Sequence, residues 1–336
     1  MASDTFQSIT IEGFKSIRSV KVDLRPINIL IGANGSGKSN FLEAFVFLGE
    51  VQAGGIDSYV EIHGGADKLF YFGSKTTKEI SLVMQAANGL RLRAHYLLSG
   101  NDRLAGTGAT AWWDESEPRL PSWKHYQFHD TGFHSPIKKT NQVDDNRYLR
   151  SDGSNLAAFL YLLSQRFPAS YGLIRKTAQQ VAPFFEDFQL EPLALNPNTI
   201  KLEWRHKRSD RYWDASEFSD GTLRFIALAT LLLQPVELRP SVILIDEPEL
   251  GLHPFAICLL ASLIKQAAFD TQVIVATQST LLLDYFGPED VLVADRVDGA
   301  TTIQRLNSDR LAEWLKDYSL GQLWQKGELE GTPVNE

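Results

Sequence analysis

The chain has 336 residues, of which 43% are hydrophobic, and this is enough to bury one large core and a second lobe. The formal net charge of −8 excludes a protein that coats nucleic acid through its overall charge, so any DNA site must be a local cluster of Lys and Arg. A single cysteine excludes an internal disulfide framework, and the lack of an apolar leader or of a run of roughly 20 apolar residues predicts a cytoplasmic protein that does not span a membrane.

The chain is expected to begin with strands that lead into a glycine-rich loop. Alternating apolar residues predict strands over Phe6–Ile11 and Ile17–Leu24, and Pro26 precedes the apolar run Ile27–Ile31. After the glycines, helical spacing predicts a helix over Asn40–Leu48. The order is therefore strand, glycine-rich loop and helix.

Further along, a β-rich segment gives way to alternating helices and strands. Short alternating runs predict β structure between Gly54 and Asn146, and helical spacing over Ser154–Val181, divided at Pro168, predicts a small helical lobe. The later elements are expected as a strand at Thr199–Trp204, helices over Thr222–Leu233 and Pro254–Ala267, and buried strands at Val242–Ile245 and Val273–Ala276. Apolar runs that alternate with helices are typical of a parallel sheet covered on both faces, so the pattern predicts an α/β fold.

The glycine-rich loop matches the phosphate-binding pattern G-x-x-x-x-G-K-[ST] between a predicted strand and a predicted helix. Its N–H groups point inward at a helix N-terminus, which favours anions. We expect Lys38 to contact the β- and γ-phosphates of ATP and Ser39 to give its hydroxyl to Mg²⁺. The expected nucleotide-binding residues are Gly32, Asn34, Gly35, Ser36, Gly37, Lys38, Ser39 and Asn40.

Two acids end the predicted strand Val242–Ile245. Asp246 is placed to hold Mg²⁺, and Glu247 can accept a proton from the attacking water. The alternative is that both acids cap the next helix. An adjacent acidic pair indicates an ATPase that uses a carboxylate as its base. In GTPase-like proteins a glutamine or a partner arginine replaces this second carboxylate.

The motifs together resemble one family. Phe14–Ile17, Glu217–Thr222 and Asp246–Pro254 are similar to segments of the RecF/SMC-type ABC ATPases, and especially of compact RecF-like AAA-family ATPases without long coiled-coil arms. The resemblance extends from Phe6 to about Asp317. It implies a P-loop NTPase of the ABC-ATPase head type, with a mixed or parallel sheet flanked by helices, a β-rich N-terminal lobe and a small helical lobe.

The resemblance also implies a domain plan and a dimer. We expect one head over residues 1–326 and a loose acidic tail over 327–336. The parts of the head are 1–53 with the phosphate-binding loop, 54–150 as a β-rich and irregular insert, 151–195 as the helical lobe, and 196–326 with the remaining motifs. Two such heads are expected to close around two ATP molecules as a homodimer.

In this family Ser219 and Gly221 correspond to a signature motif that contacts the γ-phosphate held by the opposite subunit. This chain departs from the common Leu-Ser-Gly-Gly by placing Asp220 between them, which either faces the phosphate or points away and caps the helix. A second departure is Gln278, where a histidine commonly lies at the catalytic site. Because glutamine cannot become cationic, slow turnover is expected.

Several residues keep two interpretations. Gln127 is either the lid glutamine that reaches the metal or a plain strand residue, and Lys15 is either a nucleotide contact or an exposed loop lysine. Trp112 and Trp113 either stack on bases or pack internally. The resemblance makes His253 an interface or structural residue rather than a metal ligand.

Two functions are expected, and a third is disfavoured. The first is an ATP-driven clamp that engages DNA in repair or genome maintenance, with Arg205–Arg211 as either a DNA contact or a solvated turn. The second is an ATP-gated regulatory subunit of a phage-defence or toxin system that acts through an effector protein. The motor of a membrane transporter is disfavoured because roughly 180 residues separate Lys38 from Ser219.

Overall fold

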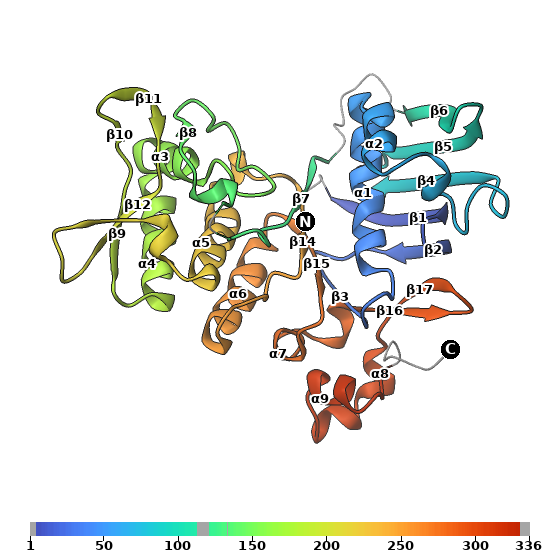
Figure 1. Ribbon diagram of the computed structural model, residues 1–336. Helices are drawn as coiled ribbons and strands as arrows, with labels where there is room; N and C mark the ends of the chain where they lie inside the picture. The colour runs from blue at the N-terminus through green and yellow to red at the C-terminus, as the bar shows by residue number, and fades with distance from the viewer. Residues whose placement is uncertain (1–4, 113–120, 133, 330–336) are drawn as a thin grey trace. The chain divides into compact units, whose positions relative to one another are not determined.

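A computed structural model describes residues 5–112, 121–132 and 134–329 (Figure 1). The chain forms two compact units, each assembled from separate stretches of sequence. The first unit comprises Met1–His125, Ser241–Asp246 and Thr271–Glu336, and the second comprises Tyr126–Pro240 and Glu247–Asp270.

A five-stranded antiparallel sheet forms the N-terminal part of the first unit. Its order is β2-β1-β4-β5-β6, with bounds Phe6–Phe14 for β1, Ile17–Asp23 for β2, Glu79–Ala86 for β4, Arg91–Ser99 for β5 and Arg103–Trp112 for β6. Both predicted strands are confirmed, and their apolar residues Phe6, Ile9, Ile11, Ile17, Val20 and Val22 are buried. The segment after Gly54, for which the alternating runs predicted β structure, also contains a helix, α2 (Ile56–Ile62).

The second sheet of this unit is mixed and has the order β17-β16-β3-β15-β14-β7. Strands β16, β3, β15 and β14 run parallel, and β17 pairs with β16 antiparallel. The bounds are Ile27–Ile31 for β3, Trp123–Tyr126 for β7, Val242–Asp246 for β14, Gln272–Thr277 for β15, Val291–Val297 for β16 and Ala300–Arg305 for β17. Every residue of β14 and β15 is buried, as expected of parallel strands covered on both faces.

Helix α1 (Lys38–Ala53) belongs to the core of the first unit. It contacts β6 of the antiparallel sheet as well as β14 and β15 of the mixed sheet. Phe41, Phe45 and Phe47 are completely buried, so the helix has apolar contacts on more than one side. Three short helices follow β15 in the chain: α7 (Thr280–Leu283), α8 (Ser308–Leu311) and α9 (Leu320–Gln325).

The described residues of the second unit form four α-helices and two small sheets. The helices are α3 (Leu156–Arg166), α4 (Pro168–Val181), α5 (Asp220–Leu233) and α6 (Pro254–Ala267), and Pro168 opens α4 as predicted. One sheet has the order β10-β11-β8 and the other β13-β12-β9. Their bounds are Asn141–Gln142 for β8, Phe185–Gln189 for β9, Pro192–Leu193 for β10, Asn196–Ile200 for β11, Glu203–His206 for β12 and Tyr212–Asp214 for β13.

One predicted strand is corrected. The expected strand Thr199–Trp204 is divided between β11 and β12, which belong to different sheets. Apolar alternation continues through the break because Ile200, Leu202 and Trp204 are all buried. The alternation therefore could not mark the change of partner strand. By contrast, the α/β class with a mixed sheet flanked by helices is confirmed.

Candidate nucleotide-binding site

The predicted phosphate-binding loop lies at the carboxyl-terminal end of the parallel strands of the mixed sheet, which is called the sheet edge below. β3 ends at Ile31, the loop follows, and α1 begins at Lys38. The register pairs Asp246, the last residue of β14, with Ala276 on β15, and Thr277 at the end of β15 with Ile31. The carboxyl ends of parallel strands are where α/β proteins place their ligand sites. The loop, Asp246 and the residue after β15 therefore share that edge.

A hydrogen bond joins the loop to the acidic strand end. Ser39 Oγ donates to Asp246 Oδ2 at 3.3 Å, although 207 positions separate the two residues. Ser39 is exposed and Asp246 is largely buried. A hydroxyl and a carboxylate oxygen are the hard donors that Mg²⁺ prefers, so this pair fits the metal that the two motifs imply.

Polar groups lie close together in the interior of the loop. Lys38 is only 5% exposed, and its Nζ donates to the carbonyls of Gly32 at 2.8 Å and Ala33 at 2.9 Å. Ser36 Oγ is buried and has no hydrogen-bond partner among the described residues. A Cβ at Gly32 would lie 2.5 Å from that hydroxyl, so only glycine fits there. An ammonium group and an unpaired buried hydroxyl suit a phosphate ligand.

Lys15 lies in the turn between β1 and β2, near helix α1. Its φ is +50°, and its Nζ is 3.8 Å from Glu43 Oε1. Burial lowers the pKa of Lys15, and the nearby Glu43 carboxylate partly offsets that effect. Glu43 also contacts Tyr59 and His63. Lys15 therefore has a carboxylate neighbour within the protein, and its contact with nucleotide remains a prediction.

Glu247 occupies a sharp turn directly after β14. Its φ is +42°, which is uncommon for a residue other than glycine, and its carbonyl accepts a hydrogen bond from Leu250 N–H. The alternative that Asp246 and Glu247 cap the next helix is wrong. Helix α6 begins at Pro254, and its cap is His253, whose Nδ1 accepts from Phe255 N–H at 3.2 Å.

The predicted signature motif forms the N-terminus of α5 in the second unit. Ser219 is the cap residue, and its Oγ accepts from Thr222 N–H at 3.1 Å. Asp220 lies in the first turn and forms an ion pair with Lys138 at 3.2 Å. Lys138 is thus the group that balances the unusual carboxylate of this motif, and the sequence analysis did not identify it.

A buried arginine holds the surroundings of this motif together. Arg224 Nε donates to Phe128 O at 2.8 Å, Nη2 donates to His129 O at 2.9 Å, and Nη1 donates to Leu250 O. Burial lowers the pKa of Arg224. The sequence analysis missed this role, although a lone arginine inside an apolar helix was a signal that three or more acceptors must surround it.

Gly221 is required for close packing within the same cluster. A Cβ at this position would lie 2.2 Å from Gly251 O, a backbone atom that cannot move aside easily. The turn around Gly251 and the start of α5 are therefore in direct contact. This contact gives Gly221 a steric role in addition to the phosphate contact that the resemblance implies.

Two glutamines complete the set of predicted site residues. Gln278 is exposed and directly follows β15, at the sheet edge that also carries the loop and Asp246. Gln127 is exposed, follows β7, and donates its backbone N–H to Ser151 O at 2.9 Å. It belongs to the second unit, whereas Ser39 belongs to the first, so its metal contact remains a prediction.

The basic segment Arg205–Arg211 begins on β12 and continues through the turn that leads to β13. Arg205 lies 3.9 Å from Glu186, and Arg211 lies 2.9 Å from Glu217 and over the ring of Trp213. Within the described ranges, the exposed side chains of Lys207 and Arg208 form no ion pair. Two of the four cations are therefore neutralised locally. Trp112 ends β6, while Trp113 lies outside the described residues, so the proposed stacking pair is untested.

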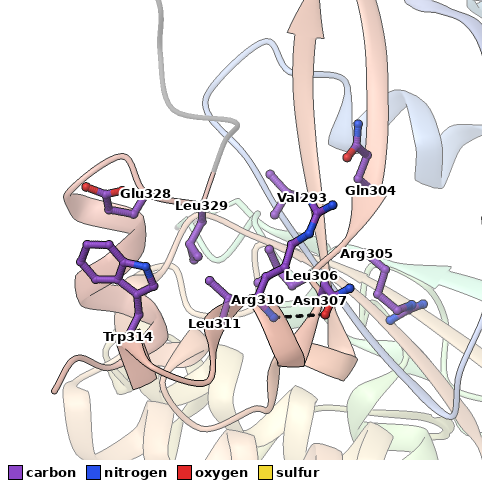
Figure 2. Close-up of a pocket in the computed structure, with 10 residues that line it drawn as sticks. All are labelled: Val293, Gln304, Arg305, Leu306, Asn307, Arg310, Leu311, Trp314, Glu328 and Leu329. Carbon is purple, nitrogen blue, oxygen red and sulfur yellow. Dashed lines mark hydrogen bonds between the residues drawn. The ribbon is translucent and has the colours of Figure 1, made fainter. Parts of the chain in front are cut away.

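A separate cavity of about 250 Å³ lies in the first unit (Figure 2). Residues from β16, β17, α8 and the C-terminal end of the described chain form its walls. Its lining residues are Val293, Gln304, Arg305, Leu306, Asn307, Arg310, Leu311, Trp314, Glu328 and Leu329. The lining includes none of the predicted nucleotide or metal residues, so the cavity is distinct from the site at the sheet edge.

Across residues 5–112, 121–132 and 134–329, no helix has both the length and the apolar character needed to cross a bilayer. Within the same residues, no group of three or more His, Cys, Asp and Glu side chains is arranged to hold a metal ion. The pair of Ser39 and Asp246 offers one hydroxyl and one carboxylate and is not such a cluster. A metal ion bound there would take most of its ligands from groups other than these two side chains.

Comparison with known proteins agrees with this geometry. A family model described as "AAA domain, putative AbiEii toxin, Type IV TA system" matches residues 27–284. A stretch of 110 residues is 30% identical to an ATP/GTP phosphatase of Helicobacter pylori, and covers 29% of this chain and 30% of that protein. A stretch of 42 residues is 52% identical to the DNA replication and repair protein RecF of Colwellia psychrerythraea, and covers 12% of this chain and 11% of that protein. The matches thus span less than a third of either relative.

The fold has a close counterpart among solved structures. An SMC head bound to the C-winged helix domain of ScpA superposes with a TM-score of 0.62, over 92% of this chain and 99% of that one, at 16% sequence identity. Such a likeness shows the fold, and the family match covers more than half of the chain. The chain therefore belongs to this family of AAA domains and has the fold of an SMC head.

Proposed function

We propose that the protein binds ATP with Mg²⁺ at the sheet edge, hydrolyses it slowly, and closes as a homodimer around two ATP molecules to engage DNA. The observation that carries the proposal is the hydrogen bond between Ser39 and Asp246. It joins the two motifs whose combination is needed to hold a nucleotide and its metal, although they are far apart in the sequence.

Each residue at the sheet edge has a chemical task in this proposal. Lys38 exchanges the carbonyls of Gly32 and Ala33 for phosphate oxygens, which charge-assisted hydrogen bonds favour. Bound Mg²⁺ would supply neutralising charge at the phosphates, with Ser39 and Asp246 holding it. Glu247 takes the proton of the attacking water, and Gln278 orients that water without adding charge. The absence of a cationic group at position 278 is why slow turnover is expected.

In this proposal the phosphate-binding loop and the signature residues of one subunit contact different ATP molecules. Each ATP is therefore fully surrounded only in the dimer. Ser219 is exposed at the start of a 14-residue helix, where backbone N–H groups and the helix dipole favour an anion. The ion pair between Lys138 and Asp220 supports the idea, since it reduces the repulsion that a bare carboxylate would exert on a phosphate.

A Ser219→Arg variant is expected to bind ATP as a monomer but to lose dimer formation and nearly all turnover. The bulky side chain would block approach of a second head. Because Ser219 also caps α5, Ser219→Ala serves as the matched control: it removes the cap, at a cost of about 1 kcal/mol, without adding bulk. Light scattering with ATP and Mg²⁺ measures the dimer. Normal dimerisation of the arginine variant would exclude a contact in trans at this position.

DNA engagement is supported by two observations. One matched relative is named a DNA replication and repair protein, and Lys207 and Arg208 project from an exposed turn. The test is ATP turnover with and without duplex DNA at low and moderate salt. Stimulation that fades with salt supports a phosphate contact, whereas equal turnover in all conditions contradicts the DNA role.

A Lys207→Ala and Arg208→Ala double variant is expected to bind duplex DNA more weakly and to lower the salt slope of binding by about two, because two phosphate contacts are removed. An Arg205→Ala and Arg211→Ala double variant is the control, since both of these arginines have carboxylate partners. Fluorescence anisotropy across a salt series measures both. If the two doubles lose affinity equally, the turn is not the specific contact.

The family description supports a second candidate function. It names a toxin and a type IV toxin–antitoxin system, which agrees with an ATP-gated regulatory subunit that acts through an effector protein. In that case ATP turnover would be indifferent to DNA. It would instead respond to a purified partner protein encoded nearby, and the absence of any such response would count against this candidate.

A further inference from the structure

A chain of hydroxyl groups lies behind the phosphate-binding loop. Asn40 Nδ2 donates to Ser16 Oγ at 2.7 Å, Ser16 Oγ is 2.7 Å from Thr301 Oγ1, and Thr301 Oγ1 donates to Ser36 O at 2.9 Å. Thr301 N–H also donates to Ser16 O at 2.8 Å. Thr301 is 1% exposed and lies at the start of β17, 285 positions from Ser16. It belongs to no motif that the sequence analysis identified.

The number of protons fixes the direction of this chain. A carbonyl oxygen only accepts, so Thr301 must give its one hydroxyl proton to Ser36 O. Ser16 must then donate to Thr301, and Ser16 Oγ accepts from the amide of Asn40. Each bond therefore has one possible donor, and the chain runs from Asn40 through Ser16 and Thr301 to the carbonyl of Ser36.

The last bond of the chain orients a backbone donor of the loop. In a trans peptide the C=O and the following N–H point in opposite directions, and the described residues contain no cis peptide. By holding Ser36 O on the side of β17, Thr301 directs Gly37 N–H to the opposite side. Gly37 has a φ of +102°, and a Cβ on it would lie 2.0 Å from Thr301 Oγ1, so a side chain at position 37 would collide with Thr301.

We propose that Thr301 is a positioning residue for ATP binding, because its hydroxyl aims the Gly37 N–H at the phosphates. The inference rests on the proposed binding of ATP by this loop. Thr301 itself touches no nucleotide. It acts by reducing the number of directions that the Ser36–Gly37 peptide can adopt before ATP arrives, so less ordering is required on binding.

A Thr301→Val variant keeps the shape of the side chain and removes its hydrogen bonds. We expect the dissociation constant of ATP to rise about tenfold, as for the loss of one well-placed hydrogen bond and the freeing of its carbonyl. Thr301→Ser should restore affinity to within about twofold. Thr302→Val is the matched control, since Thr302 is the next residue on β17 and its hydroxyl donates only a long hydrogen bond, 3.5 Å, to Asp295 O. It should leave affinity within about twofold of wild type.

The readouts separate positioning from stability. In Thr301→Val the Michaelis constant for ATP should rise while turnover at saturating ATP changes by less than about twofold. The NMR signal of the Gly37 amide should shift in this variant and return in Thr301→Ser, with melting temperature measured alongside. A variant that melts earlier but binds ATP like wild type, with an unshifted Gly37 amide, would show that Thr301 only stabilises the fold.

Two further variants keep the test decisive. If Thr301→Val does not fold, Ser16→Ala removes the donor to Thr301 while leaving Thr301 itself intact, and a rise in the dissociation constant of about threefold is expected. Unchanged affinity in Ser16→Ala would overturn the inference. If wild type and Lys38→Ala are equally unable to bind ATP, the proposed function fails instead. The Gly37 amide signals of the nucleotide-free variants then test the positioning by Thr301 separately.

Discussion

A Glu247→Gln variant is expected to bind ATP as tightly as the wild-type protein but to hydrolyse it at least about 100-fold more slowly, because the general base is lost while the shape of the side chain is kept. With ATP uncleaved, the variant should accumulate as a dimer. Single-turnover hydrolysis and light scattering in the presence of ATP and Mg²⁺ measure the two effects on the same sample.

The position of Glu247 makes this a sharp test. It lies at a strained turn with a φ of +42°, and such conformations are concentrated at functional sites. Glutamine tolerates this backbone about as well as glutamate, so the fold should be unaffected. Glu237→Gln, at an exposed position in the second unit, is the control for loss of one negative charge. Wild-type hydrolysis in Glu247→Gln would assign the base to another residue.

Removal of the loop lysine is expected to have an equally large effect. Lys38→Ala should lower ATP affinity by at least about 100-fold, since a charge-assisted contact to two phosphates is replaced by a void. Lys38 is almost fully buried, and its ammonium group donates to the backbone carbonyls of Gly32 and Ala33 in the loop. Isothermal titration with a non-hydrolysable ATP analogue measures the loss.

Lys21→Ala provides the matched control, because Lys21 is exposed on β2 and its loss changes the net charge by the same amount. It should bind the analogue like the wild-type protein. A melting curve separates a loss of binding from a loss of fold in Lys38→Ala. Retention of tight binding by a folded Lys38→Ala would remove this loop from the proposed nucleotide site.

The sequence alone was sufficient for the elements whose causes are local. The strand, loop and helix around Gly32 to Ser39 are confirmed, because apolar runs, glycine spacing and helical periodicity all act over a few residues. The parallel arrangement of β3, β14 and β15 is confirmed for a similar reason, since strands buried on both faces have continuous apolar sequences. The break between β11 and β12 was missed because alternation does not report which strand is the partner.

Side chains that act at a distance could be assigned only from the tertiary structure. Nothing near Asp220 in sequence predicts that Lys138 lies 3.2 Å away, and nothing near Leu223–Leu233 predicts which three carbonyls surround Arg224. The contact of Lys138 with Asp220 spans 82 positions, and the contacts of Arg224 with Phe128, His129 and Leu250 span 96, 95 and 26 positions. Folding of the whole core brings these segments together.

The sequence by itself determined the fold class of this protein, the position of its glycine-rich loop and the acidic pair at the end of β14, since those features depend on residue type and short-range spacing. Only the tertiary structure decided that Ser39 meets Asp246 and that Thr301 holds the Ser36 carbonyl. The physical reason is that a hydrogen bond requires its two atoms to be about 3 Å apart in a fixed direction. Sequence spacing imposes no such distance on residues separated by 207 or 265 positions.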